Sequence, residues 1–87
     1  MRRRLGQAFA RAVEQSAPLW GIDMTDARAR GMVLSLAQYH AREIGWAERD
    51  ADDLAALIEH HYNRVRVSLA SLASLLAETE DENACRN

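Results

Sequence analysis

The fold of this chain is decided by residues 50–79, which read DADDLAALIEHHYNRVRVSLASLASLLAET. Apolar side chains recur there in steps of three and four residues, the spacing that keeps side chains on one face of an α-helix. They form a continuous seam of Leu54, Ile58, Tyr62, Val65, Leu69, Leu72 and Leu76. No glycine or proline occurs between Ala47 and the end of the chain. The stretch therefore predicts one long helix.

The start of this helix is rich in aspartate. Asp50 is expected to be the N-cap, with Asp52 and Asp53 in the first turn, where carboxylates face the positive end of the helix dipole. A helix of about 30 residues is about 45 Å long, which exceeds the width of a small globule. Its seam must be covered by the same chain, by a second copy or by a target. A bundle core is the simplest interpretation, and a partner-binding or dimerising face is the alternative.

The residues before this stretch predict two further helices. Residues 1–17 show a short amphipathic pattern that ends before Pro18. Residues 23–44 predict a second helix, and Gly45 suits the position just beyond a helix end. The short connection 45–49 makes the second and third helices antiparallel neighbours. The packing face of the second helix is expected to be lined by Ala27, Gly31, Leu34, Ala37, Ala41 and Ile44.

Together these patterns predict an all-α protein, a small helical bundle with two long antiparallel helices and a shorter N-terminal helix. With 87 residues, the chain has room for a single helical domain over 1–87. Its helices are expected over 1–17, 23–44 and 50–79, and an acidic tail over 80–87. Aromatic residues are only 6 % of the chain, which indicates a thin core. Association into a homodimer would add buried surface.

Charge and cysteine content narrow the setting in which the chain is expected to act. Residues 1–30 hold six arginines against three acidic residues, and residues 48–82 hold nine acidic residues against three arginines. These charges could attract each other within a dimer or complement a partner, although solvated faces explain them equally simply. The lone Cys85 fits a reducing cytoplasm. No apolar run is long enough for a membrane span, and Gln7 and Arg11 interrupt the only signal-like segment.

No grouping of residues predicts catalysis. Candidate metal ligands are present, but the zinc pattern His-Glu-x-x-His is absent, and a di-iron site would need paired Glu-x-x-His units. His61 adjoins the seam and is expected to be partly buried and hydrogen-bonded, whereas His60 is expected in solvent. The sequence therefore predicts no enzyme, no metal and no cofactor. The side chains that could serve as metal ligands are those of His40, Glu43, Glu59, His60 and His61.

Direct nucleic-acid binding is the less favoured of the binding functions. The Arg-rich residues 1–30 are the only candidate surface. The expected helices are too long for a compact helix-turn-helix, and the net charge of the chain is −2.

The last helix resembles that of a known family of regulators. Residues 58–61, Ile-Glu-His-His, are followed by 68–72, Ser-Leu-Ala-Ser-Leu, and by Leu75 and Leu76, and together they resemble the C-terminal helix of the TraM antiactivators. Pro18–Ile22 and Thr25–Asp26 resemble the segment that leads into the first long helix of that family. The resemblance covers about two thirds of the chain. The Arg-rich N-terminus and the short connection 45–49 depart from the family.

The resemblance implies a particular function. TraM proteins are small helical dimers that bind a quorum-sensing activator of the LuxR type and block its binding to DNA. The resemblance therefore implies that the partner is a transcriptional activator or another nucleic-acid-binding complex. On the last helix it would assign dimer or activator contacts to Ile58, His61, Leu69 and Leu72.

The residues themselves favour a non-enzymatic regulator or inhibitor, of the size and charge of plasmid or phage inhibitors, that binds a protein through helix faces. Aromatic and arginine side chains are the usual anchors of interfaces. Trp20 could instead plug the end of the bundle. The alternatives are a structural homo-oligomer and a small nucleic-acid-binding protein that uses the Arg-rich N-terminus. The further candidate interface residues are Trp20, Tyr39, Trp46, Arg64 and Arg66.

Overall fold

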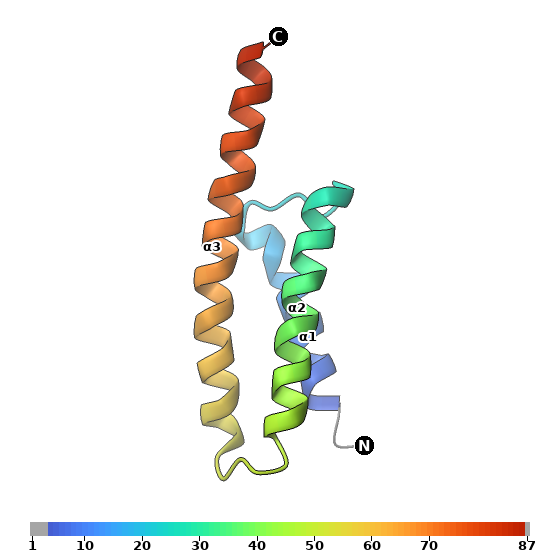
Figure 1. Ribbon diagram of the computed structural model, residues 1–87, viewed down its shortest axis with the longest axis vertical. Helices are drawn as coiled ribbons and strands as arrows, with labels where there is room; N and C mark the ends of the chain where they lie inside the picture. The colour runs from blue at the N-terminus through green and yellow to red at the C-terminus, as the bar shows by residue number, and fades with distance from the viewer. Residues whose placement is uncertain (1–3, 87) are drawn as a thin grey trace.

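The computed structural model describes the backbone of residues 4–86 and the side chains of residues 5–78. In this part of the chain the elements are α1 (Arg4–Ser16), the 3-10 helix η1 (Ala17–Trp20), α2 (Ala27–Ala47) and α3 (Leu54–Arg86), with no strand. α2 and α3 run antiparallel, and the shorter α1 lies beside α2 (Figure 1). The predicted all-α fold with two long antiparallel helices is therefore confirmed.

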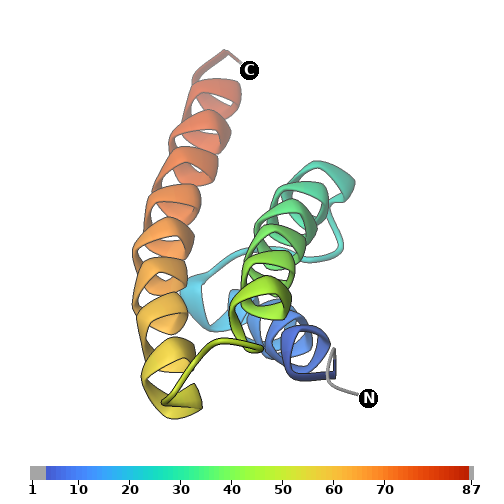
Figure 2. The same cartoon turned by 60° about the horizontal axis from the view of Figure 1, so that its bottom comes forward.

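α1 packs closely against α2. Its buried side chains are Phe9, Ala10 and Val13. Near its start, a Cβ atom built on Gly6 would lie 2.5 Å from the carbonyl oxygen of Ala41 in α2. The two backbones can approach this closely only because Gly6 has no side chain. Figure 2 shows the resulting pair of helices on one side of the molecule, with α3 on the other.

The chain turns between α1 and α2 through residues 17–26. Pro18 lies in the first turn of η1, where its missing N–H costs no helix hydrogen bond. Gly21 then ends η1 with a φ of 81°, a left-handed conformation that favours glycine. Asp26 is the N-cap of α2, and its carboxylate accepts a hydrogen bond of 3.3 Å from the N–H of Ala29.

The predicted boundaries and packing face of the second helix are wrong in detail. α2 starts at Ala27 and continues through Gly45 to Ala47, so Gly45 does not end the helix. Ala27 and Gly31 of the predicted face are exposed. The true buried face is rotated, because α2 must contact α1 and α3 together rather than one partner. Its members are Ala29, Val33, Ala37, His40 and Ile44.

α3 also differs from prediction at both ends. Asp50 lies in a turn, where its N–H donates to the carbonyl of Ala47, and Asp53 is the residue whose carboxylate accepts from the N–H of Ala56, at 3.1 Å. The helix therefore begins at Leu54 rather than after Asp50. It continues to Arg86, so the predicted boundary at 79 is wrong. The side chains of the predicted acidic tail, including Cys85, lie outside the described residues, as do Arg2 and Arg3.

The predicted seam of α3 is buried in its middle only. Val65 and Leu69 are in the core, and Ile58, Leu72 and Leu76 are half-buried against it. Leu54 and Tyr62 are exposed. The principal extents of the molecule are 54 × 20 × 17 Å, and the C-terminal part of α3 extends beyond the N-terminal end of α2 (Figure 1). None of the helices in the described residues is long and apolar enough to cross a membrane.

Candidate functional site

The outer face of α2 presents aromatic and arginine side chains to solvent. Ser35, Tyr39, Arg42 and Trp46 follow one another in steps of four, three and four residues, so they share one face of the helix; we call this face the α2 stripe. Tyr39 is 47 % exposed and Trp46 is 66 % exposed. The α2 stripe exists because the opposite face of the same helix is committed to the core.

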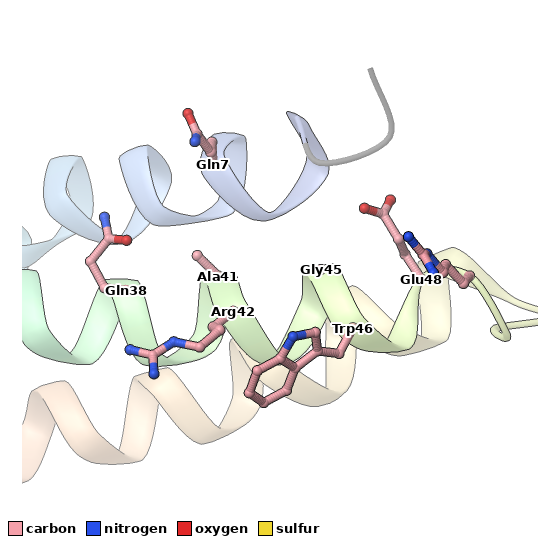
Figure 3. A pocket seen from close by; sticks show the side chains of 8 residues that line it. Gln7, Gln38, Ala41, Arg42, Gly45, Trp46 and Glu48 are labelled. Carbon is pink, nitrogen blue, oxygen red and sulfur yellow. The ribbon is translucent and has the colours of Figure 1, made fainter.

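The α2 stripe borders an open groove where the start of α1 meets the end of α2. Figure 3 shows Arg42 and Trp46 side by side on α2, on the side away from α1, whereas Glu48 projects toward the side of α1. The Oε1 atom of Glu48 is buried and, within the described part of the chain, has no hydrogen-bond partner. The groove has a volume of about 570 Å³ and is lined by Gln7, Gln38, Ala41, Arg42, Gly45, Trp46, Glu48 and Arg49.

α3 carries a second exposed surface. Val67 is 68 % exposed and borders a shallow depression with Arg64, His60, Asn63 and Ser68. Elsewhere on the helix, the Arg66 guanidinium lies 5.9 Å from the centre of the Tyr62 ring, a cation–π distance. Arg64 and Arg66 are both exposed.

The candidate interface residues from the sequence divide into two groups. Tyr39 and Trp46 share the α2 stripe, and Arg64 and Arg66 are exposed on α3. The others are covered by the chain itself, because the core takes up the middle of the seam. Trp20 is partly buried and packs against the core from η1, as expected for a plug. Ile58 and Leu72 are half-buried, and His61 and Leu69 are buried.

A pair of histidines lies in the core between α2 and α3. His40 is 2 % exposed and His61 is 5 % exposed. Their Nδ1 atoms are 2.8 Å apart, so one ring donates its N–H and the other accepts with its lone pair. The Phe9 ring of α1 lies 6.2 Å from the His40 ring and 6.3 Å from the His61 ring, measured between centroids. The expected burial and hydrogen bonding of His61 are confirmed.

Sequence reasoning missed His40 as the partner of His61. His40 belongs to the buried face of α2, but the predicted face was rotated away from it. A signal was available: His40 continues the three- and four-residue spacing of Val33, Ala37 and Ile44.

The surroundings of the pair favour its neutral form. Burial lowers the pKa of His40, and the nearby His61, Arg64 and His60 lower it further, while Glu43 acts in the opposite direction. Burial is also the main cause that lowers the pKa of His61, followed by His60 and Arg64, again opposed by Glu43. Both rings therefore stay neutral at pH values at which a solvated histidine would begin to take up a proton.

Within residues 5–78, no three or more histidine, cysteine, aspartate or glutamate side chains gather where they could hold a metal ion. The histidine pair alone supplies two side-chain ligands, fewer than the four of a closed structural zinc site.

No protein-family model, curated protein or solved structure matches this chain. The resemblance of the last helix to the TraM antiactivators therefore stays a prediction from the sequence.

Proposed function

We propose that this protein is a small non-enzymatic regulator that binds another protein through the α2 stripe. The observation that carries the proposal is the exposure of Tyr39 and Trp46 on one face of α2, with Arg42 between them. Soluble chains bury most of their large aromatic residues. Tyrosine, tryptophan and arginine are also the residues most enriched among the anchors of protein interfaces.

The free energy gained by burying the aromatic side chains of the α2 stripe supports its use as a binding surface. Burying an exposed tryptophan or tyrosine in an interface is worth roughly 2–4 kcal/mol before the costs of association. Two such anchors about two turns apart would supply much of the affinity of a moderate complex. α2 is also basic, with three arginines and one glutamate between Ala27 and Ala47. The partner we propose therefore has an apolar recess bordered by carboxylates.

The resemblance to the TraM antiactivators favours one class of partner. In this version of the proposal, the protein blocks a transcriptional activator or another nucleic-acid-binding complex by occupying its surface.

Removal of the anchors tests the proposal. Tagged wild-type protein, Trp46→Ala and Tyr39→Ala would be used to capture partners from the native host, with quantitative mass spectrometry of what is retained. A genuine partner should be depleted about 10- to 100-fold by Trp46→Ala, the loss expected for a hot-spot side chain. Because Trp46 is exposed, the free energy of unfolding should change by less than about 0.5 kcal/mol.

Leu19→Ala is the matched control. Leu19 is 86 % exposed but lies in η1, outside the α2 stripe, so its removal should leave capture unchanged. A partner retained equally by wild type and Trp46→Ala, or lost equally with Leu19→Ala, would contradict the role of the α2 stripe.

A homodimer is a second candidate, favoured by a separate observation. The C-terminal part of α3 extends past the N-terminal end of α2 (Figure 1), and a second copy could pack beside it. Sedimentation equilibrium over a range of concentrations should then give twice the 9.8 kDa chain mass. Trp46→Ala should not change this mass if the dimer forms along α3. A single-chain mass at all concentrations would exclude the dimer.

A further inference from the structure

The His40–His61 pair joins two helices that are otherwise packed unequally. α1 and α2 form the larger interface of the molecule, with the close approach at Gly6, whereas α3 contacts α2 over a smaller surface. At that smaller surface, a buried hydrogen bond of 2.8 Å connects the rings of His40 and His61. The state of this bond therefore bears directly on whether α3 stays in place.

We propose that the His40–His61 pair is a pH-sensitive latch, which holds α3 against α1 and α2 when it is neutral and releases α3 when both rings are protonated. The reason is the number of hydrogen-bond donors and acceptors at the two Nδ1 atoms in each protonation state. A neutral pair has one Nδ1–H and one Nδ1 lone pair, which form the bond. A singly protonated pair can still share one proton between the two nitrogens. A doubly protonated pair has two donors and two positive charges facing each other, so the bond is lost.

Charged and titratable groups around the pair set how readily it takes up protons. From α2, Glu43 favours the charged rings, and the Tyr39 ring lies edge-on to His40 with centroids 5.2 Å apart. From α3, Arg64 and His60 oppose the charged rings. From α1, the uncharged Phe9 ring covers both. The effect of one carboxylate is thus opposed by Arg64, His60 and burial, a balance that keeps the closed latch neutral.

Opening of the latch would uncover a surface that is hidden in the closed chain. Val65 and Leu69 lie on the same face of α3 as His61 and are buried beside it. Release of α3 would expose both side chains together with the half-buried Ile58. α1 and α2 would stay paired through their close contact at Gly6 and Ala41, which involves no histidine ring. This role is independent of the α2 stripe, so it stands whether or not that face binds a partner.

Hydrogen exchange of the wild-type chain provides the direct test. Amide protection would be measured between about pH 7.5 and 5.5 and corrected for the intrinsic pH dependence of exchange, and the three imidazoles would be titrated by NMR in the same samples. Where the open form binds two more protons than the closed form, linkage raises the opening constant up to about 100-fold per pH unit. Amides of α3 from 58 to 69 should lose protection as the pH falls and should be less protected at each pH than those of α1 and α2, which exchange only when the whole chain unfolds.

Two outcomes of that experiment would overturn the latch. In the first, His40 and His61 become protonated while the amides of α3 keep their protection. In the second, the amides of all three helices are equally protected at each pH, so α3 exchanges only when the whole chain unfolds and is not released on its own.

A pair of variants separates the histidine bond from other acid effects. The double variant His40→Gln/His61→Gln keeps a donor and an acceptor at each position but cannot titrate, so the pH dependence of α3 protection should disappear. His60→Gln removes only the exposed neighbouring histidine, so the pH dependence of α3 protection should remain. An unchanged pH dependence in the double variant would overturn the proposal. If the double variant does not fold, the wild-type titration decides alone.

Discussion

Gly6 is a residue at which α1 and α2 approach each other closely. Its missing side chain is what lets α1 approach the backbone of α2, since a Cβ atom there would lie 2.5 Å from the carbonyl oxygen of Ala41. Neither backbone can give way without moving Phe9 or Val13, which are buried a little further along α1. Packing at this point therefore depends on the absence of one methyl group.

Gly6→Ala should destabilise the fold. The clash is expected to outweigh the helix propensity gained with alanine and to lower the free energy of unfolding by about 1–3 kcal/mol. Gly31→Ala is the matched control, because Gly31 is also helical but nothing lies within 4 Å of its added Cβ; it should raise stability by about 0.5–1 kcal/mol. Urea unfolding followed by circular dichroism measures both. Equal effects of the two substitutions would disprove the close approach.

At the scale of the element, the start of α3 depends on which aspartate caps it. Four residues between 50 and 53 include three aspartates, and all three suit a helix start by composition. The structure places the accepting carboxylate on Asp53 and uses the N–H of Asp50 in the turn that leaves α2. Because α3 begins at Leu54, residues 48–53 are free to span the distance between the two antiparallel helices.

Asp53→Ala should therefore cost more than either neighbouring substitution. Loss of an N-cap lowers the free energy of unfolding by about 1 kcal/mol. Asp50→Ala and Asp52→Ala leave the cap in place and should change it by less than about 0.5 kcal/mol. Urea unfolding of the three variants provides the comparison. A larger loss with Asp50→Ala than with Asp53→Ala would restore the boundary expected from the sequence.

At the scale of the whole molecule, the histidine pair makes stability depend on pH. Burial lowers the pKa of His40 and His61 in the folded chain, so the unfolded chain takes up protons first as the pH falls. The stabilisation contributed by the neutral pair is complete above the unfolded pKa of about 6.5. It declines as the pH falls from that value toward the lower folded pKa values.

The free energy of unfolding should therefore fall between about pH 7.5 and 5.5, by up to about 1.4 kcal/mol per pH unit for each proton taken up. Urea denaturation at a series of pH values measures it, with His60→Gln as the variant expected to keep the slope. A stability that is constant or rises as the pH falls over this range would contradict the burial of the pair.

The sequence alone was sufficient for the fold class. The regular spacing of Leu54, Ile58, Val65 and Leu69 follows from the period of the α-helix, a local property that needs no knowledge of neighbours. The antiparallel arrangement followed from a connection too short for any other. The burial of His61 was also predictable, since that residue adjoins the seam.

Tertiary structure alone decided which faces meet and where each long helix begins and ends. α2 contacts two helices at once, and its buried face is set by the compromise between them, which brought His40 to His61 and turned Tyr39 and Trp46 outward. Spacing within one helix allowed two overlapping buried faces, and only the positions of the other helices selected the one that includes His40. Three neighbouring aspartates offered equivalent caps, and only the path of the chain between α2 and α3 selected Asp53.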